Sequence, residues 1–268
     1  MRFTDGDLRF LAGVVAGDDQ GAAAGLVRAW RDEPSLVEPA LDDERVVRHL
    51  MADPGLVVAL SPRFLFSVLL RRIRRDLSEI PYTVERIHAD GRLVVFDAAI
   101  AHSLLRAPAI FDYLVDLLVS FERAETVVVQ RVSDPVRVHR LNTLSIEDMM
   151  ELAGLIDPTM RPMVFRRIGD IALFTTGLFP AAVVRGQRPT LAARPAAPPR
   201  QRLRIEDYEA EGRRFYRLAA DRLVSSHPAL AQVLVRLSEE FTAARKPLTV
   251  LSERYVTWAR PRWTQAPS

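Results

Sequence analysis

Apolar residues recur at helical spacing along most of the chain. In the first 60 residues they mark short helices separated by turn signals, and the first follows Thr4, a residue type that caps helices well. Ser61-Pro62 joins a cap residue to proline at the first helical position, so it predicts the start of a longer helix. The spacing predicts further helices over 93–105 and 110–121, each apolar around most of its circumference. The chain is therefore expected to be mainly α-helical.

Two segments between these helices carry other signals. Thr83 is expected to cap a short helix that Asp90-Gly91 ends. Residues 126–141 are rich in β-branched side chains and are divided by a turn signal, which predicts a β-hairpin. Helical spacing resumes after Ser145, which is followed by an acidic residue three positions later, as in a capping box. The predicted fold is a multi-helix globular bundle with one small β-hairpin.

Arginine and proline dominate residues 181–204, which contain no acidic residue. Such a segment buries too little apolar surface to offset the entropy lost on ordering, so we expect a linker. Apolar faces return beyond it. Gly212 lies on the first of them and is expected to allow a close contact between helices, and Pro247 is expected to restart a last helix. We therefore expect a helical domain over 1–180, a linker over 181–204 and a C-terminal helical segment over 205–262 that packs on the first domain.

Composition excludes several protein classes. Of the 268 residues, 49% are hydrophobic and none is cysteine, which excludes wholesale disorder, a disulfide scaffold, a thiol nucleophile and a cysteine-ligated metal. The net charge is only +3, and Lys246 is the single lysine among 37 basic residues. The sequence pI near 9.6 therefore reflects the high pKa of arginine more than a strong positive field. Arginine in place of lysine is typical of GC-rich genomes and of some thermophilic proteins.

Targeting and membrane signals are not apparent in the sequence. Residues 1–7 are polar and do not resemble a signal peptide. The longest nearly uncharged stretch, 168–184, is shorter than the roughly 20 residues that a membrane-spanning helix needs. We expect a cytoplasmic protein without membrane insertion.

Common catalytic motifs are also missing from the sequence. It contains no P-loop, no dinucleotide-binding glycine motif and no Gly-x-Ser-x-Gly elbow, so we expect no cofactor. Glu85 and His88 have the Glu-x-x-His spacing that places two ligands on one helical face in di-iron bundles, and they are the candidate metal ligands. Asp170, inside an apolar helix, is the candidate catalytic carboxylate, although Arg166 one turn earlier is expected to neutralise it.

Arginine clusters are the candidate contacts for an anion or a nucleic acid. Residues 110–121, which precede the hairpin, are apolar and acidic, unlike a DNA-reading helix, and the linker has no aromatic residue for base stacking. Binding through phosphates is therefore expected to be weak and independent of base sequence. The candidates are Arg71, Arg72 and Arg75 near a helix C-terminus, Arg137 and Arg140 in the hairpin, and Arg185, Arg188, Arg194, Arg200, Arg202 and Arg204 in the linker.

The predicted helical fold and the missing catalytic motifs together favour a non-catalytic regulatory or assembly module that binds a protein partner or another copy of itself. Two alternatives stay open. One is a helical enzyme with an acidic or histidine site, with or without a metal. The other is a sequence-independent nucleic-acid binder that uses arginine-rich surfaces.

Overall fold

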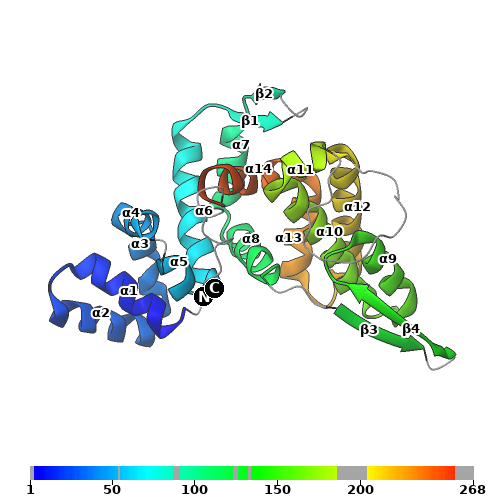
Figure 1. The fold of residues 1–268 in the computed structure, drawn as a ribbon, viewed down its shortest axis with the longest axis horizontal. Coiled ribbons are helices and arrows are strands. Elements are labelled where there is room, and N and C mark those ends of the chain that lie inside the picture. The colour runs from blue at the N-terminus through cyan, green and yellow to red at the C-terminus, as the bar shows by residue number, and fades with distance from the viewer. Residues whose placement is uncertain are drawn as a thin grey trace, which may run out of the picture.

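The computed structural model describes residues 3–53, 55–86, 91–122, 126–131, 134–185 and 204–256. These residues form a mainly α-helical fold with two antiparallel two-stranded sheets (Figure 1). The helices are α1 (Asp5–Ala16), α2 (Gln20–Asp32), α3 (Glu38–Leu41), α4 (Glu44–Ala52), α5 (Gly55–Ala59), α6 (Pro62–Glu79), α7 (Ala98–Arg106), α8 (Pro108–Ser120), α9 (Ile146–Leu155), α10 (Arg161–Leu178), α11 (Pro180–Val184), α12 (Ile205–Leu223), α13 (Pro228–Glu239) and α14 (Phe241–Leu251). The strands are β1 (Thr83–Arg86), β2 (Arg92–Val95), β3 (Thr126–Arg131) and β4 (Asp134–Asn142).

The predicted mainly α fold with a hairpin over 126–141 is confirmed, since β3 pairs with β4 in this region. Among the described residues, no helix has both the length and the apolarity needed to cross a bilayer. The expected linker falls mostly on residues 186–203, which lie outside the described residues, as do residues 257–262 of the expected C-terminal segment.

The described chain has two hydrophobic cores that share α6. The smaller core lies in the N-terminal lobe, which we define as residues 3–60, and includes Phe64 and Val68 from the first half of α6. The larger core lies in the rest of the described chain, from α6 onward, which we call the main body. It includes Leu70 and Ile73 from the next turns of the same helix. Figure 1 shows α6 standing between the lobe and the remaining helices. One continuous helix therefore joins the two cores.

Local capping fixes where α1 and α6 begin. Thr4 and Asp7 form a reciprocal capping box, and the Ser61 hydroxyl accepts a hydrogen bond from the backbone N–H of Phe64. The buried Asp7 carboxylate also accepts hydrogen bonds from the backbone N–H and the hydroxyl of Ser61, at 2.8 and 2.6 Å. One carboxylate thus links the starts of two helices through residues that are 54 positions apart in the chain.

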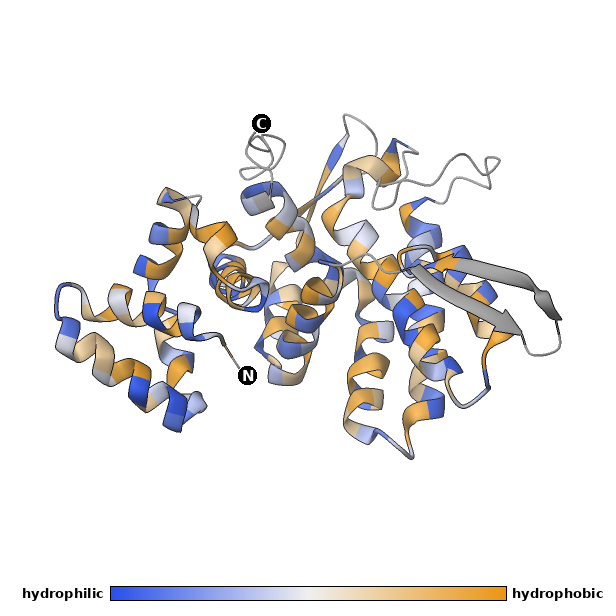
Figure 2. Cartoon of the chain, turned by 60° about the horizontal axis from the view of Figure 1, so that its bottom comes forward, coloured by the Kyte–Doolittle hydropathy of each residue, from blue (hydrophilic) through white to orange (hydrophobic). Residues whose placement is uncertain are grey.

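Helices of the main body pack closely, and most carry both hydrophobic and hydrophilic residues along their length (Figure 2). Gly212 of α12 is buried between α10 and α14. A Cβ atom at this position would lie 3.0 Å from the Cβ of Ala172 and would overlap the ring of Phe241. The helices can approach this closely only because glycine has no side chain. The position of Gly212 on an apolar face predicts such a contact.

Replacing Gly212 with leucine is expected to lower the free energy of unfolding by about 1–3 kcal/mol, because the added atoms overpack the contact between helices. Gly25→Ala in α2 is the matched control, since its Cβ would meet nothing within 4 Å, and helix propensity predicts a gain of up to about 1 kcal/mol. Denaturant unfolding of both variants measures the difference. Equal or higher stability of the Gly212 variant would contradict the packing.

Three local expectations were wrong. Thr83 begins strand β1 instead of capping a helix, and residues 92–95 form β2, so the next helix begins only at Ala98. Short β-branched runs at these positions pair with each other, which outweighs the cap signal. Pro247 lies inside α14 and does not restart a helix, because buried Phe241 and Leu248 hold the turns on both sides of it against the core.

Candidate functional site

The β1–β2 hairpin is a feature of the structure that local sequence signals did not predict. Its antiparallel register pairs Thr83 with Val95 and Val84 with Val94. Directly opposite residues point to the same side of a sheet, and successive residues alternate. Thr83 and Glu85 therefore share one side, which we call the inner face, and Val84 and Val94 share the other, which we call the outer face. Figure 1 shows the hairpin at the periphery, beside α7.

The inner face lies against a buried lysine. Lys246 of α14 is 2% exposed, pairs with Glu85, and places its Nζ 2.9 Å from a carboxylate oxygen of Asp97. The hydroxyl of Thr83 donates a hydrogen bond to the other oxygen of Asp97 at 2.5 Å. Because Asp97 directly precedes α7, these contacts tie the hairpin, the start of α7 and α14 together.

A second buried cation extends this network. Arg245, 4% exposed, lies 2.9 Å from a carboxylate oxygen of Glu209 on α12 and 3.2 Å from one of Glu85. The hydroxyl of Thr242 donates to Glu209 at 2.9 Å. Buried charges are tolerated when they are paired in this way, and removing one partner is costly. We call Glu85, Asp97, Glu209, Arg245 and Lys246 the Lys246 cluster.

The outer face carries exposed apolar residues together with the exposed Arg92, and Leu93 of the inner face is also 48% exposed. The residues Tyr82, Val94 and Phe96 are 42%, 50% and 77% exposed, and the two aromatic rings meet edge to face with centroids 6.1 Å apart. Ile100, one turn into α7, is 55% exposed. A hairpin on the surface of an isolated protein is expected to place apolar residues inward and polar ones outward. Here the buried ion pairs lie beneath the hairpin and the aromatic residues face solvent.

The candidate carboxylate Asp170 lies deep inside the main body at 3% exposure. It accepts hydrogen bonds from the hydroxyls of Tyr113 on α8 and Tyr216 on α12, at 2.5 and 2.9 Å, and Arg166 Nε lies 3.6 Å away. Burial raises the pKa of Asp170 above its ordinary value, while Arg166 and the two hydroxyls oppose this shift. The site joins three helices, and its tyrosines were not predicted because they occur within otherwise apolar faces.

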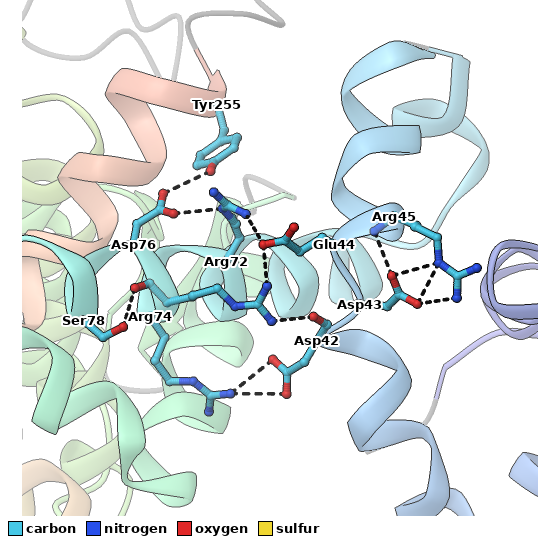
Figure 3. Close-up of polar contacts among 10 residues, drawn as sticks. Asp42, Asp43, Glu44, Arg45, Arg72, Arg74, Asp76, Ser78 and Tyr255 are labelled. Atoms are coloured by element: carbon cyan, nitrogen blue, oxygen red, sulfur yellow. Dashed lines mark hydrogen bonds and ion pairs between the residues drawn. The ribbon is translucent and has the colours of Figure 1, made fainter.

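The arginines of α6 contact acids of the N-terminal lobe (Figure 3). Arg72 and Arg75 approach Glu44 at 3.3 and 2.9 Å, and Arg74 approaches Asp42 at 3.2 Å. These acids come from the end of α3 and the start of α4, 28 to 32 residues earlier in the chain. The cluster therefore attaches the lobe to α6.

Arg71 is the most buried member of this group. It pairs with Glu38 and with Asp42, the latter at 3.1 Å, and its guanidinium lies 5.2 Å from the ring centre of Phe111. Burial lowers the pKa of Arg71 to about 10, and the neighbouring charge of Arg74 adds to this effect. An external anion at these arginines would have to compete with carboxylates that the fold already supplies.

The other predicted site residues are dispersed. Glu85 lies on a strand, so the helical face assumed for Glu85 and His88 is wrong, and His88 lies outside the described residues. In the part of the chain that the structure describes, no group of three or more histidine, aspartate or glutamate side chains could hold a metal ion. Arg137 and Arg140 belong to β4, and Arg185 and Arg204 are exposed. Arg188, Arg194, Arg200 and Arg202 lie outside the described residues.

Comparison with known proteins supplies no family to interpret these features. No protein-family model, no curated protein and no solved structure matches this chain.

Proposed function

We propose that the chain is a non-catalytic assembly module that binds a second folded protein chain through the outer face of the β1–β2 hairpin. One observation supports this above the others: the hairpin has buried charges beneath it and exposed aromatic residues on its outer face. Glu85 is paired with Lys246, whereas Phe96 is 77% exposed. An exposed apolar face of this kind is typical of a binding surface.

The energetics of the outer face suit protein binding. Fully burying a large apolar side chain contributes about 1.5–3 kcal/mol, and Phe96 has most of its surface still to bury. Aromatic residues are enriched at the centre of protein interfaces, where they carry much of the binding energy. The ion pairs of Lys246 hold the hairpin in place before binding, so little order has to be gained at the interface.

Two groups of candidate residues for the alternative functions have internal partners. Asp170, the candidate carboxylate, is bound by two tyrosine hydroxyls and approached by Arg166. Arg72 and Arg75, candidates for contact with phosphate, are paired with Glu44. These contacts favour a structural role for both groups, whereas most of Phe96 on the outer face is exposed to solvent.

Co-purification tests this proposal. Two copies of the chain with different tags are produced together in the organism that encodes it, and one tag is used for purification. We expect at least one polypeptide, either the other copy or a different protein, to be retained in stoichiometric amount. Retention should be lost with Phe96→Ser, because the substitution removes the most exposed aromatic ring of the outer face.

The matched control is Val58→Ser in α5, a side chain that is 85% exposed in the N-terminal lobe. This variant should retain the same polypeptides as the wild type. Identical retention by the wild type and by Phe96→Ser would overturn the proposed function.

A further inference from the structure

We propose that η2 (Ser252–Val256), the π-helical turn that follows α14, is a strap that holds the N-terminal lobe on α6 through Asp76 and Arg72. Release of this turn would loosen the lobe while the main body stays folded. The strap lies apart from the outer face of the hairpin and does not rest on the proposed function.

Asp76 is the residue at which η2 meets α6. Its carboxylate is buried near the C-terminal end of α6, with one oxygen 2.8 Å from Nε of Arg72 and the other 2.9 Å from Nη1 of Arg254. The hydroxyl of Tyr255 lies 3.5 Å from the second oxygen (Figure 3). A buried carboxylate is costly unless it is paired, so Asp76 holds Arg72 and η2 at the same place.

Arg72 connects Asp76 to the lobe. Its Nε faces Asp76, and its Nη1 lies 3.3 Å from a carboxylate oxygen of Glu44. Among the described residues, each ion pair between the lobe and the main body uses an arginine of α6, and Arg72 is the one of these arginines that also pairs with Asp76. Two side chains of α6 therefore link η2 to the start of α4.

The two acids compete for the guanidinium of Arg72. Asp76 is closer to it and more buried than Glu44, and Arg254 supplies part of the positive charge that Asp76 needs. With η2 in place, Arg72 divides its donors between the two acids. When η2 is released, Arg72 has to neutralise Asp76 without Arg254, so its pair with Glu44 weakens. The turn thus stabilises the attachment of the lobe through α6.

The turn can detach while α14 stays in place. Leu251, the last residue of α14, is fully buried, and the hydroxyl of Ser252 donates to the carbonyl of Leu178 at 2.6 Å. Beyond this anchor, Arg254 is half exposed and Tyr255 is half-buried. π-Helical turns are rare and often lie at functional sites. Release can therefore begin at Arg254 without unfolding α14.

Because the chain has no cysteine, a single introduced thiol can report the opening of the lobe. Val68 of α6 is fully buried in the smaller core, so Val68→Cys places a thiol in the contact between α6 and the lobe. Val115→Cys in α8 places an equally buried thiol in the main body. Under native conditions, the rate at which a thiol reagent labels each cysteine reports how often that position opens to solvent.

The measured quantity is the labelling rate of Val68→Cys divided by that of Val115→Cys. Arg254→Ala should raise this ratio about two- to fivefold, the range that corresponds to one partly exposed ion pair. Glu44→Ala should also raise it, because the lobe loses its pair with Arg72. Arg217→Ala, which breaks an exposed pair with Asp221 on α12, is the matched control and should leave the ratio unchanged.

The double variant tests the route through Arg72. If η2 acts on the lobe through the pair of Arg72 with Glu44, Arg254→Ala should raise the ratio no further once Glu44→Ala is present. Circular dichroism checks that each variant is folded. An unchanged ratio for Arg254→Ala, or the same increase with and without Glu44→Ala, would overturn the strap.

Discussion

Replacing Lys246 with alanine is expected to lower the free energy of unfolding by about 3–5 kcal/mol, the usual effect of removing one partner from a buried ion pair. Lys246 is 2% exposed and pairs with both Glu85 and Asp97. Without its ammonium group, both carboxylates lose a cation beneath the hairpin, and among the described residues Arg245 is the remaining cation paired with Glu85. Denaturant unfolding followed by circular dichroism measures the loss.

Two further variants show whether charge is the cause. Arg217→Ala, which breaks an exposed ion pair with Asp221, should change stability by less than about 1 kcal/mol. Neutralising Lys246 and its two partners, with Lys246→Met combined with Glu85→Gln and Asp97→Asn, should recover much of the stability lost in Lys246→Ala, because Arg245 keeps its pair with Glu209 and no unpaired charge is left buried. A loss for Lys246→Ala no larger than that for Arg217→Ala would refute a stabilising role of the Lys246 cluster.

Replacing Asp170 with alanine is expected to lower the free energy of unfolding by about 2–6 kcal/mol. The change removes the shared acceptor of Tyr113 and Tyr216, and each buried hydroxyl that loses its partner costs about 1–3 kcal/mol. Asp170→Asn is the conservative control, since the amide oxygen still accepts a hydrogen bond, and it should lose clearly less. Equal losses for the two variants would show that the hydrogen bonds at Asp170 contribute little.

Comparing Asp170→Asn with the wild type gives a pH dependence of stability with a definite sign. Because burial raises the pKa of Asp170, the folded state holds a proton at this site at pH values where the unfolded chain has lost it. The stability contributed by this proton is fully present below the unfolded value near about pH 4 and is lost as the pH rises through the folded pKa. The stability of Asp170→Asn minus that of the wild type should therefore increase from about pH 4 upward. Chemical unfolding at several pH values measures this difference, and a decrease would contradict the raised pKa.

Local signals explain which parts of the fold the sequence could predict. Thr4, Ser61 and Ser145 cap the helices that they precede, because capping depends on residues within a single turn. Gly212 was predicted at a close contact because glycine destabilises a helix, so its presence on an apolar face indicates that a neighbouring helix needs the space. Threonine serves both helix caps and strands, so Thr83 could not be assigned from its own segment.

The candidate site depends on contacts between distant parts of the chain. Lys246 stood out as the single lysine, yet its partner Glu85 is 161 residues away, and no local pattern connects them. The outer face did leave a signal, since Tyr82 and Val84, and likewise Val94 and Phe96, alternate as residues on one side of a strand do. The alternation covers too few residues to distinguish a strand from a helix unless the pairing of the two segments is already known.

Photo-crosslinking in cells tests most directly whether another chain covers the outer face. A photoreactive phenylalanine analogue is placed at position 96 in one version of the protein and at position 58 in another, both highly exposed sites. We expect light to produce one adduct of defined mass from position 96 and none from position 58. An absence of adduct at position 96, or the same adducts from both positions, would contradict the assignment of the hairpin as the binding surface.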